Sequence, residues 1–415
     1  MSGFIKRATA AASAAVITLT ATGCSNGFFK EYQSREEISV PTEISFAWWG
    51  GDARADYTFK GIKIFERENS DINVQPYSSD YVGYKESLDA LYSFGKESDI
   101  IQLNYAWLNE YSLDGEGFYD LNTLSDEIAL DNFTEEQLSY GMINGKLNAI
   151  PISLNAITFY YNEDMLKEIG EEIPETWDDL FECGSKLAAE GKYLFETANI
   201  YLWLMLTAHE EQTTGKAAAD FDTENLASMM RFAKELNEGG VIHLGENYDK
   251  TNYFGGKCAG QLLWASDAQN YAYSDDSQIT TVIGKYISTE EPLRSGWYVK
   301  PTSLYAISKN SDDPQSAARL LNYLLNGEEM AELQGIEKGI PLSRSALETL
   351  DGKEMLTGTA YSAGKMITDS QNELQPMTKG LEDTERINSF FVQLEQYMKG
   401  EKTAEAAAGD VILQS

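Results

Sequence analysis

Apolar and polar positions alternate with two different periods in the part of the chain that follows Pro41. Runs of apolar, β-branched and aromatic residues predict strands over residues 43–49, 72–77 and 99–103. Between them, apolar residues recur at helical spacing, namely Ala55, Phe59, Ile62 and Phe65, and then Tyr84, Leu88 and Leu91. Strand, helix, strand, helix and strand in this order predict an α/β fold with a parallel, doubly wound sheet.

Such a sheet binds ligands beyond the carboxyl ends of its strands. Aromatic and polar residues follow two of the predicted strands: Trp48, Trp49 and Asp52 after the first, and Asn104 and Trp107 after the third. Because position and residue type agree, we expect a ligand site at this edge of the sheet.

A second α/β region begins after a turn at residues 145–151. Residues 152–161 are rich in β-branched and aromatic residues and predict an extended segment, followed by a helix near Asn162. Another helix follows Thr176, which can cap its first turn. Trp177 lies on the apolar face of that helix, so we expect it to pack in the core.

Composition narrows the classes of function. The chain has 415 residues, with 66 acidic and 32 basic side chains and a formal net charge of −34. This charge argues against binding to nucleic acid or to an anionic lipid surface through basic residues. Two histidines are too few for a histidine-rich metal site. Cys183 and Cys258 either pair or remain as free, partly buried thiols, which spacing alone does not decide.

The N-terminus has the features of a processing signal. Lys6 and Arg7 precede a weakly apolar run, and the segment ends in small residues before Cys24, which resembles a bacterial lipobox. We therefore expect residues 1–23 to be a lipoprotein signal peptide. Cys24 then carries the lipid that anchors the protein on the extracytoplasmic face of the cell membrane, and residues 24–41 form a tether. The alternative is a cleaved secretory peptide with an incidental cysteine.

Aromatic residues near hydrogen-bonding side chains favour a carbohydrate ligand. Flat rings cover the apolar faces of a pyranose, while amides, carboxylates and guanidinium groups bind its hydroxyls. Trp48 and Trp49 lie close to Asp52 and Arg54 in the sequence. Similarly, Trp264 precedes Asp267, and Trp297 lies between Arg294 and Lys300.

The chain resembles the family 1 extracellular solute-binding proteins, which are sugar-binding lipoproteins of ABC importers related to maltose-binding protein. The resemblance rests on the order and spacing of several segments, at residues 19–24, 48–50, 160–164, 174–180, 256–264, 305–311, 313–325 and 400–407. Together these segments cover essentially the whole chain.

The resemblance implies a two-lobe, type II-like periplasmic-binding fold with hinge strands and a ligand cleft. Lobe 1 is expected over residues 42–151 plus 304–345, and lobe 2 over 152–303 plus 346–415. The chain then crosses between lobes near Pro151, near Tyr305 and over 341–345. The expected ligand-binding residues are Trp48, Trp49, Asp52, Arg54, Asn104, Trp107, Asn155, Trp264, Asp267, Trp297 and Arg344. Arg344 either enters the cleft or braces the hinge.

The resemblance also implies a monomeric binding protein that delivers a sugar to permease subunits, without catalysis, cofactor or metal. Lys300, Arg294 and Arg344 leave an acidic sugar open. The alternatives are a secreted carbohydrate-active enzyme, a glycan sensor or adhesin without transport, and a binding protein for a peptide, a polyamine or iron.

Overall fold

The computed structural model describes residues 40–244, 248–268, 279–378 and 380–414. The predicted signal peptide, Cys24 and all but the last two residues of the predicted tether lie outside the described residues.

The first sheet has five strands, in the order β2 (Ile72–Ser79), β1 (Thr42–Trp49), β3 (Ile100–Leu103), β12 (Leu304–Ile307) and β6 (Ile150–Pro151). The pairs β1–β2 and β1–β3 are parallel, which confirms the predicted doubly wound unit. The pairs β3–β12 and β12–β6 are antiparallel, because β12 and β6 belong to segments that pass to and from the second sheet. This sheet and its helices are called lobe 1 below.

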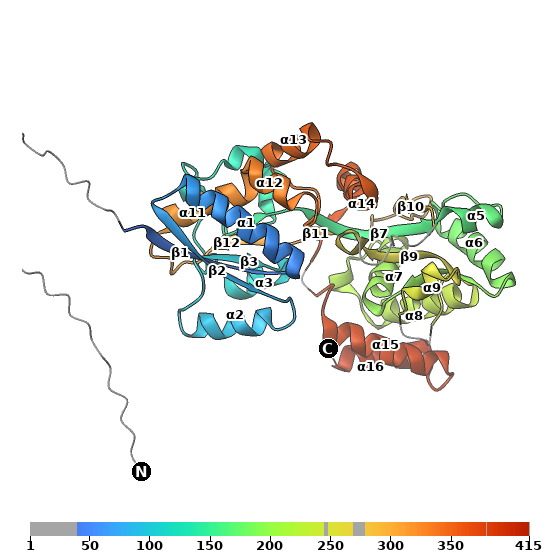
Figure 1. The fold of residues 1–415 in the computed structure, drawn as a ribbon. Coiled ribbons are helices and arrows are strands. Elements are labelled where there is room, and N and C mark those ends of the chain that lie inside the picture. Colours follow the sequence, from blue (N-terminus) through green and yellow to red (C-terminus); the bar gives the residue numbers. More distant parts are fainter. Residues whose placement is uncertain (1–39, 245–247, 269–278, 379, 415) are drawn as a thin grey trace, which may run out of the picture. The chain divides into compact units, whose positions relative to one another are not determined.

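Helices cover both faces of the first sheet, and α1 and α2 lie on opposite faces (Figure 1). The helices of lobe 1 are α1 (Asp52–Glu68), α2 (Tyr84–Ser93), α3 (Tyr105–Tyr111), α11 (Pro314–Asn326), α12 (Glu328–Gln334) and α13 (Arg344–Gly352). Successive residues of β1 point to opposite faces. Trp48 therefore joins the core beneath α1 and α11, whereas Trp49 joins the core beneath α2 and α3.

The predicted buried face of α1 is only partly correct. Ile62 and Phe65 are buried as expected, but Phe59 is 40% exposed. The helix buries Tyr57 and Thr58 instead, which lie on the same face as Gly61 and Phe65. Phe59 lies at the border of this face, edge-on to the Trp48 ring at a centroid distance of 5.3 Å.

The second sheet has the order β13 (Gln375–Pro376), β11 (Tyr298–Pro301), β7 (Leu154–Asn162), β9 (Cys258–Trp264) and β8 (Tyr193–Thr197), with β10 (Thr281–Gly284) paired to β7. The predicted extended segment forms β7, all nine residues of which are buried. This sheet and its helices are called lobe 2 below.

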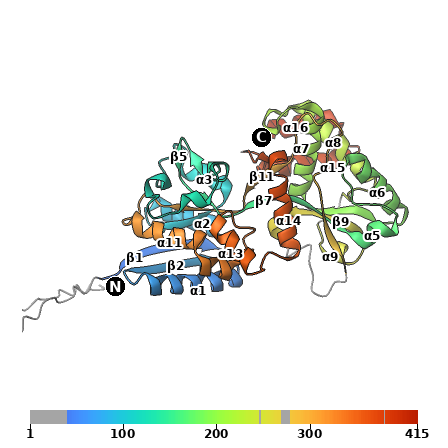
Figure 2. The ribbon, with the colours of Figure 1, turned by 90° about the horizontal axis from the view of Figure 1, so that it is seen from above.

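The helices associated with lobe 2 are α5 (Glu163–Glu168), α6 (Trp177–Ala189), α7 (Asn199–Thr214), α8 (Thr223–Glu238), α9 (Thr251–Phe254), α14 (Gly358–Asp369), α15 (Thr384–Met398) and α16 (Ala404–Gln414). Thr176 caps α6 in a capping box with Asp179, as the sequence predicts. Trp177 and Trp203 are buried in the core of this lobe, as expected. In Figure 2, α14 lies beside β7 on the side that faces lobe 1.

Smaller elements complete the described chain. They are α4 (Glu135–Ser139), the hairpin of β4 (Met142–Ile143) and β5 (Lys146–Leu147), and 3₁₀ turns at Leu121–Leu124, Leu130–Asn132, Ala218–Asp220, Ala265–Asp267 and Gln371–Glu373. No helix of the described residues is both long enough and apolar enough to cross a membrane.

Two segments cross between the two sheets side by side, and a third segment, residues 338–342 between α12 and α13, packs against them. The backbone N–H of Ile152 donates to Ser303 O at 3.0 Å, and that of Thr302 donates to Ser153 O at 2.9 Å. The third segment joins them through Leu342, whose N–H donates to Ile152 O at 3.0 Å. The chain stays with lobe 1 longer than predicted, because α13 packs against α11 and α12, and α14 is the next helix to pack against β7.

Gly339 in the third segment requires glycine for two reasons. Its φ is +94°, and a Cβ there would lie 2.6 Å from Ser153 Oγ.

We expect Gly339→Ala to lower the free energy of unfolding by about 1–3 kcal/mol, measured by urea denaturation. Gly352→Ala is the control, because its Cβ would meet no atom within 4 Å. Equal stability of the two variants would contradict this account of the third segment.

Candidate functional site

A cleft with a volume of about 370 Å³ lies where the crossing segments meet the ends of both sheets. Its lining residues are Trp49, Arg54, Tyr81, Gln102, Asn104, Asn155, Trp264, Ser266, Asp267, Lys300, Thr302, Ser303, Lys338 and Glu382. They come from β1, α1, β3, β7, β9 and β11 and from the segments that follow β2, β3, β9, β11, α12 and β13. A cleft of this size accommodates a small organic ligand.

Stacked aromatic rings form the lobe 1 wall of the cleft. Tyr81 is 50% exposed and its ring is parallel to that of Trp107, at a centroid distance of 5.9 Å. Trp49 contacts both rings at 5.6 Å. Asn104 Nδ2 donates to Tyr81 Oη at 3.2 Å, while Asn104 Oδ1 caps α3. Tyr81 is therefore an exposed aromatic surface that is supported from behind and held at its hydroxyl.

Trp264 is the aromatic residue of the lobe 2 wall. It ends β9, and the Lys300 ammonium lies 4.4 Å from its ring centroid, within cation–π distance. Lys300 also forms an ion pair with Glu382. Tyr201 packs edge-on against Trp264 at 6.2 Å. The indole is thus fixed by one ring and one cation.

Amide and carboxyl groups lie beside this indole. Asn155 and Ser266 exchange two hydrogen bonds, from Asn155 Nδ2 to Ser266 Oγ at 3.0 Å and from Ser266 N to Asn155 Oδ1 at 3.2 Å. Asp267 Oδ2 accepts a hydrogen bond from the Tyr201 hydroxyl at 3.0 Å. Burial raises the pKa of Asp267, and the Tyr201 hydrogen bond and the charges of Arg54 and Lys300 oppose that shift.

The base of the cleft is polar. Arg54 Nε pairs with Glu337 Oε2 at 2.7 Å. Lys338 Nζ donates to Tyr305 Oη at 2.6 Å and to Gln102 Oε1 at 3.4 Å. These contacts join α1, β3 and β12 of lobe 1 to the segment between α12 and α13, which packs against the two crossings. The polar groups therefore lie next to the hinge.

Six of the residues expected from the sequence line this cleft, namely Trp49, Arg54, Asn104, Asn155, Trp264 and Asp267. The other five lie elsewhere. Trp107 supports Tyr81, and Trp48 is fully buried and stacked on Phe46 at 4.8 Å. The buried Trp297 donates from Nε1 to Ile287 O at 2.7 Å, and Asp52 and Arg344 are exposed at the first positions of α1 and α13.

Sequence reasoning missed Tyr81, Gln102 and Lys338 as candidates. Tyr81 follows the carboxyl end of β2, so the rule applied to β1 and β3 would have found it. Lys338 lies in the segment between α12 and α13, shortly before residues 341–345, where the sequence predicted a crossing. Gln102 lies within β3, and only the pairing of that strand with β12 places it at the base of the cleft.

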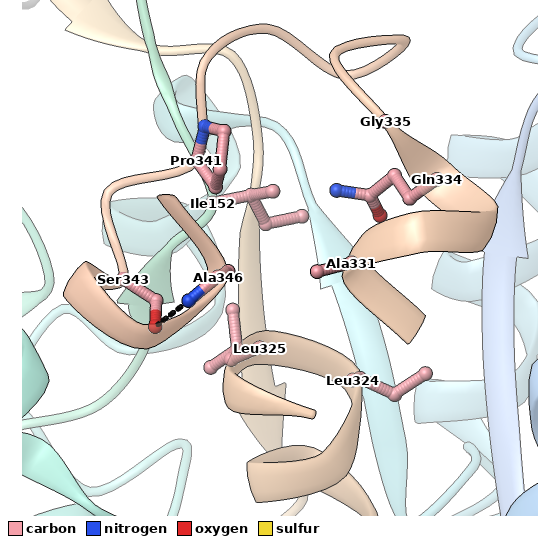
Figure 3. Close-up of a pocket in the computed structure, with 9 residues that line it drawn as sticks. All are labelled: Ile152, Leu324, Leu325, Ala331, Gln334, Gly335, Pro341, Ser343 and Ala346. Carbon is pink, nitrogen blue, oxygen red and sulfur yellow. Dashed lines mark hydrogen bonds between the residues drawn. The ribbon is translucent and has the colours of Figure 1, made fainter. Parts of the chain in front are cut away.

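Two other cavities help to define the site. A second cavity of about 310 Å³ shares Glu382 with the cleft and is lined by Tyr105, Ala106, Asn109, Glu110, Met377, Thr378, Gly380, Glu382 and Asp383. Figure 3 shows a cavity in lobe 1 beneath Pro341, beside the hydrogen bond from Ala346 N to Ser343 Oγ. Its volume of about 10 Å³ admits at most one water-sized guest, so it is not a ligand site.

The described residues offer little for nucleophilic or metal chemistry. No group of three His, Cys, Asp or Glu among them is arranged to hold a metal ion. Cys183 and Cys258 are free and buried, and burial raises the pKa of both thiols to about 12. Neither thiol is therefore an activated nucleophile. Burial also lowers the pKa of the His209 imidazole to about 4, and its ring stacks on Phe232.

Comparison with known proteins places the chain in a family. Residues 60–357 match the family described as bacterial extracellular solute-binding protein, and the chain belongs to this family. Membership implies an extracytoplasmic location. The periplasmic oligogalacturonide-binding protein of Yersinia enterocolitica, solved with saturated digalacturonic acid, is 25% identical with a TM-score of 0.77, covering 89% of this chain and 98% of its own. The predicted two-lobe α/β fold is thereby confirmed.

Two further similar proteins have different functions in their names, one a binding protein and the other an esterase. The multiple sugar-binding protein of Streptococcus mutans is 24% identical over 179 residues, which are 43% of this chain and 42% of that protein. A de novo designed cysteine esterase is 25% identical with a TM-score of 0.80, covering 90% of this chain and 98% of its own. The family itself consists of binding proteins, and the raised thiol pKa values in this chain do not suit a cysteine esterase.

The buried carboxyl of Asp267 generates a prediction about stability. Because its pKa is raised in the folded state, the unfolded chain ionises first and stability falls as the pH rises through the unfolded and then the folded pKa. We expect Asp267→Asn to raise the urea midpoint at pH 7, with a difference that shrinks towards pH 4. The exposed Asp126→Asn is the control. A larger advantage of Asp267→Asn at pH 4 than at pH 7 would refute the assignment.

Proposed function

We propose that this protein is the substrate-binding lipoprotein of an ABC importer, and that it captures a sugar or oligosaccharide in the cleft. Lipid on Cys24 holds it at the extracytoplasmic face of the membrane, and it delivers the sugar as a monomer to the permease subunits. The observation that carries the proposal is the cleft itself, which combines aromatic rings from both lobes with amide, carboxyl and cationic groups.

The chemistry of the cleft suits a pyranose. The half-exposed face of Tyr81 and the indole of Trp264 offer flat surfaces for the C–H faces of sugar rings. Asn104, Asn155 and Asp267 supply acceptors and donors for hydroxyl groups. Relatives that bind multiple sugars and oligogalacturonides support the same class of ligand.

The energetics are adequate without covalent or metal chemistry. Micromolar affinity requires about 8 kcal/mol. Each aromatic contact contributes about 0.5–1.5 kcal/mol beyond burial, and each net hydrogen bond a similar amount. Burial of the sugar C–H faces on two rings adds to these contributions and offsets part of the cost of association.

Hinge closure is the proposed link between binding and delivery. The lobes are joined by two adjacent segments, at residues 151–154 and 301–304, and by residues 353–357 between α13 and α14, so small backbone rotations there change the width of the cleft. A ligand that contacts both Tyr81 and Trp264 stabilises the state in which both rings lie within its reach.

The first experiment is a thermal-shift screen of residues 25–415, unfolded and refolded to remove bound ligand, against mono- and oligosaccharides that include uronic acids. A ligand at 100 times its Kd stabilises the folded state by about 2.7 kcal/mol, which raises the melting temperature visibly. Binding without consumption of the glycan supports a binding protein. Its hydrolysis would favour an enzyme, and no shift with any glycan would refute the carbohydrate proposal.

Trp264→Ala tests the aromatic contact directly. We expect it to lower the affinity for the best glycan about tenfold or more, because it removes a stacking surface. Phe94→Ala is the matched control, since Phe94 is 79% exposed and does not line the cleft. Isothermal titration calorimetry measures both, and equal affinities would exclude Trp264 from the binding site.

Transport itself is tested in cells of the source organism. Deleting the permease genes should abolish uptake of the glycan while leaving the purified protein able to bind it. Uptake that continues would favour the alternative of a glycan sensor or adhesin.

A further inference from the structure

Lys338 is a buried cation at the base of the cleft. The residue is 3% exposed and lines the cleft beside Gln102, Ser303 and Thr302. Its ammonium group has three N–H donors. The two acceptors that contact it are the neutral Tyr305 hydroxyl at 2.6 Å and the Gln102 side-chain carbonyl at 3.4 Å.

The other two cations that line the cleft each have a carboxylate partner. Arg54 pairs with Glu337, and Lys300 pairs with Glu382. Among the described residues, no carboxylate lies within ion-pair distance of Lys338. Of the three cationic side chains that line the cleft in the described part of the chain, Lys338 is thus the one without an ion pair.

The charges that face Lys338 do not compensate for its burial. Arg54 on α1 repels its charge, and Glu337, the preceding residue, attracts it but is already bound to Arg54. On the neighbouring elements, Tyr305 of β12 and Tyr57 of α1 have raised pKa values and are neutral at pH 8. Burial, followed by repulsion from Arg54, lowers the pKa of Lys338 to about 7.

Three charged groups of lobe 2 complete the set around the cleft. Lys300 and Glu382 neutralise each other, and Asp267 accepts from Tyr201. Asp267 pairs with no cation of the described residues, but the charges that act on Lys338 are those of Arg54 and Glu337, not that of Asp267. A buried ammonium group is costly unless an anion and further hydrogen bonds accompany it.

We propose that the ligand supplies this anion, and that Lys338 binds the carboxylate of a uronic acid unit in the captured sugar. The inference rests on the proposed function and names the class of sugar. A carboxylate fits the site because it accepts the remaining N–H of Lys338 in a charge-assisted hydrogen bond, next to the Ser303 hydroxyl, which accepts from Gln102 Nε2.

Binding is then coupled to proton uptake. The ligand carboxylate raises the pKa of Lys338, so the complex carries a proton that most free molecules lack at pH 8. The affinity for a uronate therefore falls as the pH rises above about 7. A sugar without the carboxylate shows no such dependence.

The test compares glucuronate- and galacturonate-containing disaccharides with the same disaccharides after reduction of the carboxyl group to an alcohol. Calorimetry at pH 8 in two buffers of different ionisation enthalpy measures the protons exchanged. We expect one of the uronates to bind with uptake of about half to one proton. Its reduced form should bind at least about tenfold more weakly and without uptake.

Lys338→Met assigns the effect to this residue. We expect the uronate affinity to fall about 10- to 100-fold and proton uptake to disappear, while the affinity for a neutral sugar changes less than about threefold. Methionine fills similar volume without a charge, and the melting temperature of the variant verifies its folding. Lys353→Met, at the exposed residue that follows α13, is the matched control and should bind like the parent.

The outcomes separate this inference from the proposed function. Equal affinity for a uronate and its reduced form, or proton uptake that persists in Lys338→Met, overturns the role of Lys338. An equal loss of affinity for charged and neutral sugars in that variant also overturns it. Binding of neutral sugars alone leaves the proposed function intact, whereas binding of no sugar overturns both.

Discussion

Backbone hydrogen bonds between the crossing segments are the constraint on which the rest of the structure depends. The pairs Ile152–Ser303 and Thr302–Ser153 hold two antiparallel crossings together, and Leu342 joins the segment between α12 and α13 to them. Two of these residues, Thr302 and Ser303, also line the cleft, so the geometry that joins the lobes also shapes the cleft. Gly339 allows this close approach, because a side chain there would collide with Ser153.

Each wall of the cleft presents an aromatic ring that neighbouring side chains hold in place. Lobe 1 presents Tyr81 on a support of Trp49 and Trp107, and lobe 2 presents Trp264 fixed by Lys300 and Tyr201. Rings that are already held in place lose little conformational freedom when a ligand binds. Asn104 contributes to this preorganisation, because it caps α3 with Oδ1 and donates from Nδ2 to the Tyr81 hydroxyl.

Charge is distributed unevenly between the surface and the cleft. The protein has a net charge of −34, yet Arg54, Lys300 and Lys338 all line the cleft. Ion pairs with Glu337 and Glu382 compensate for two of them, and the third depends on neutral acceptors. A strongly acidic chain therefore retains three cationic side chains in one cleft, because short-range pairs outweigh the screened field of distant charges.

The sequence by itself determined the parallel unit β1–β2–β3, the buried strand β7 and the capped helix α6, because periodicity and capping are local properties of the chain. The rule about strand ends also led to Trp49 and Asn104. It did not separate Trp49 from Trp48, since adjacent residues of a strand face opposite sides and only packing against α1 decides which side is closed. Tertiary structure alone decided where Gln102 and Lys338 lie, because the residues they contact are more than thirty residues away in sequence. These residues meet only where β3, β12 and the segment between α12 and α13 come together.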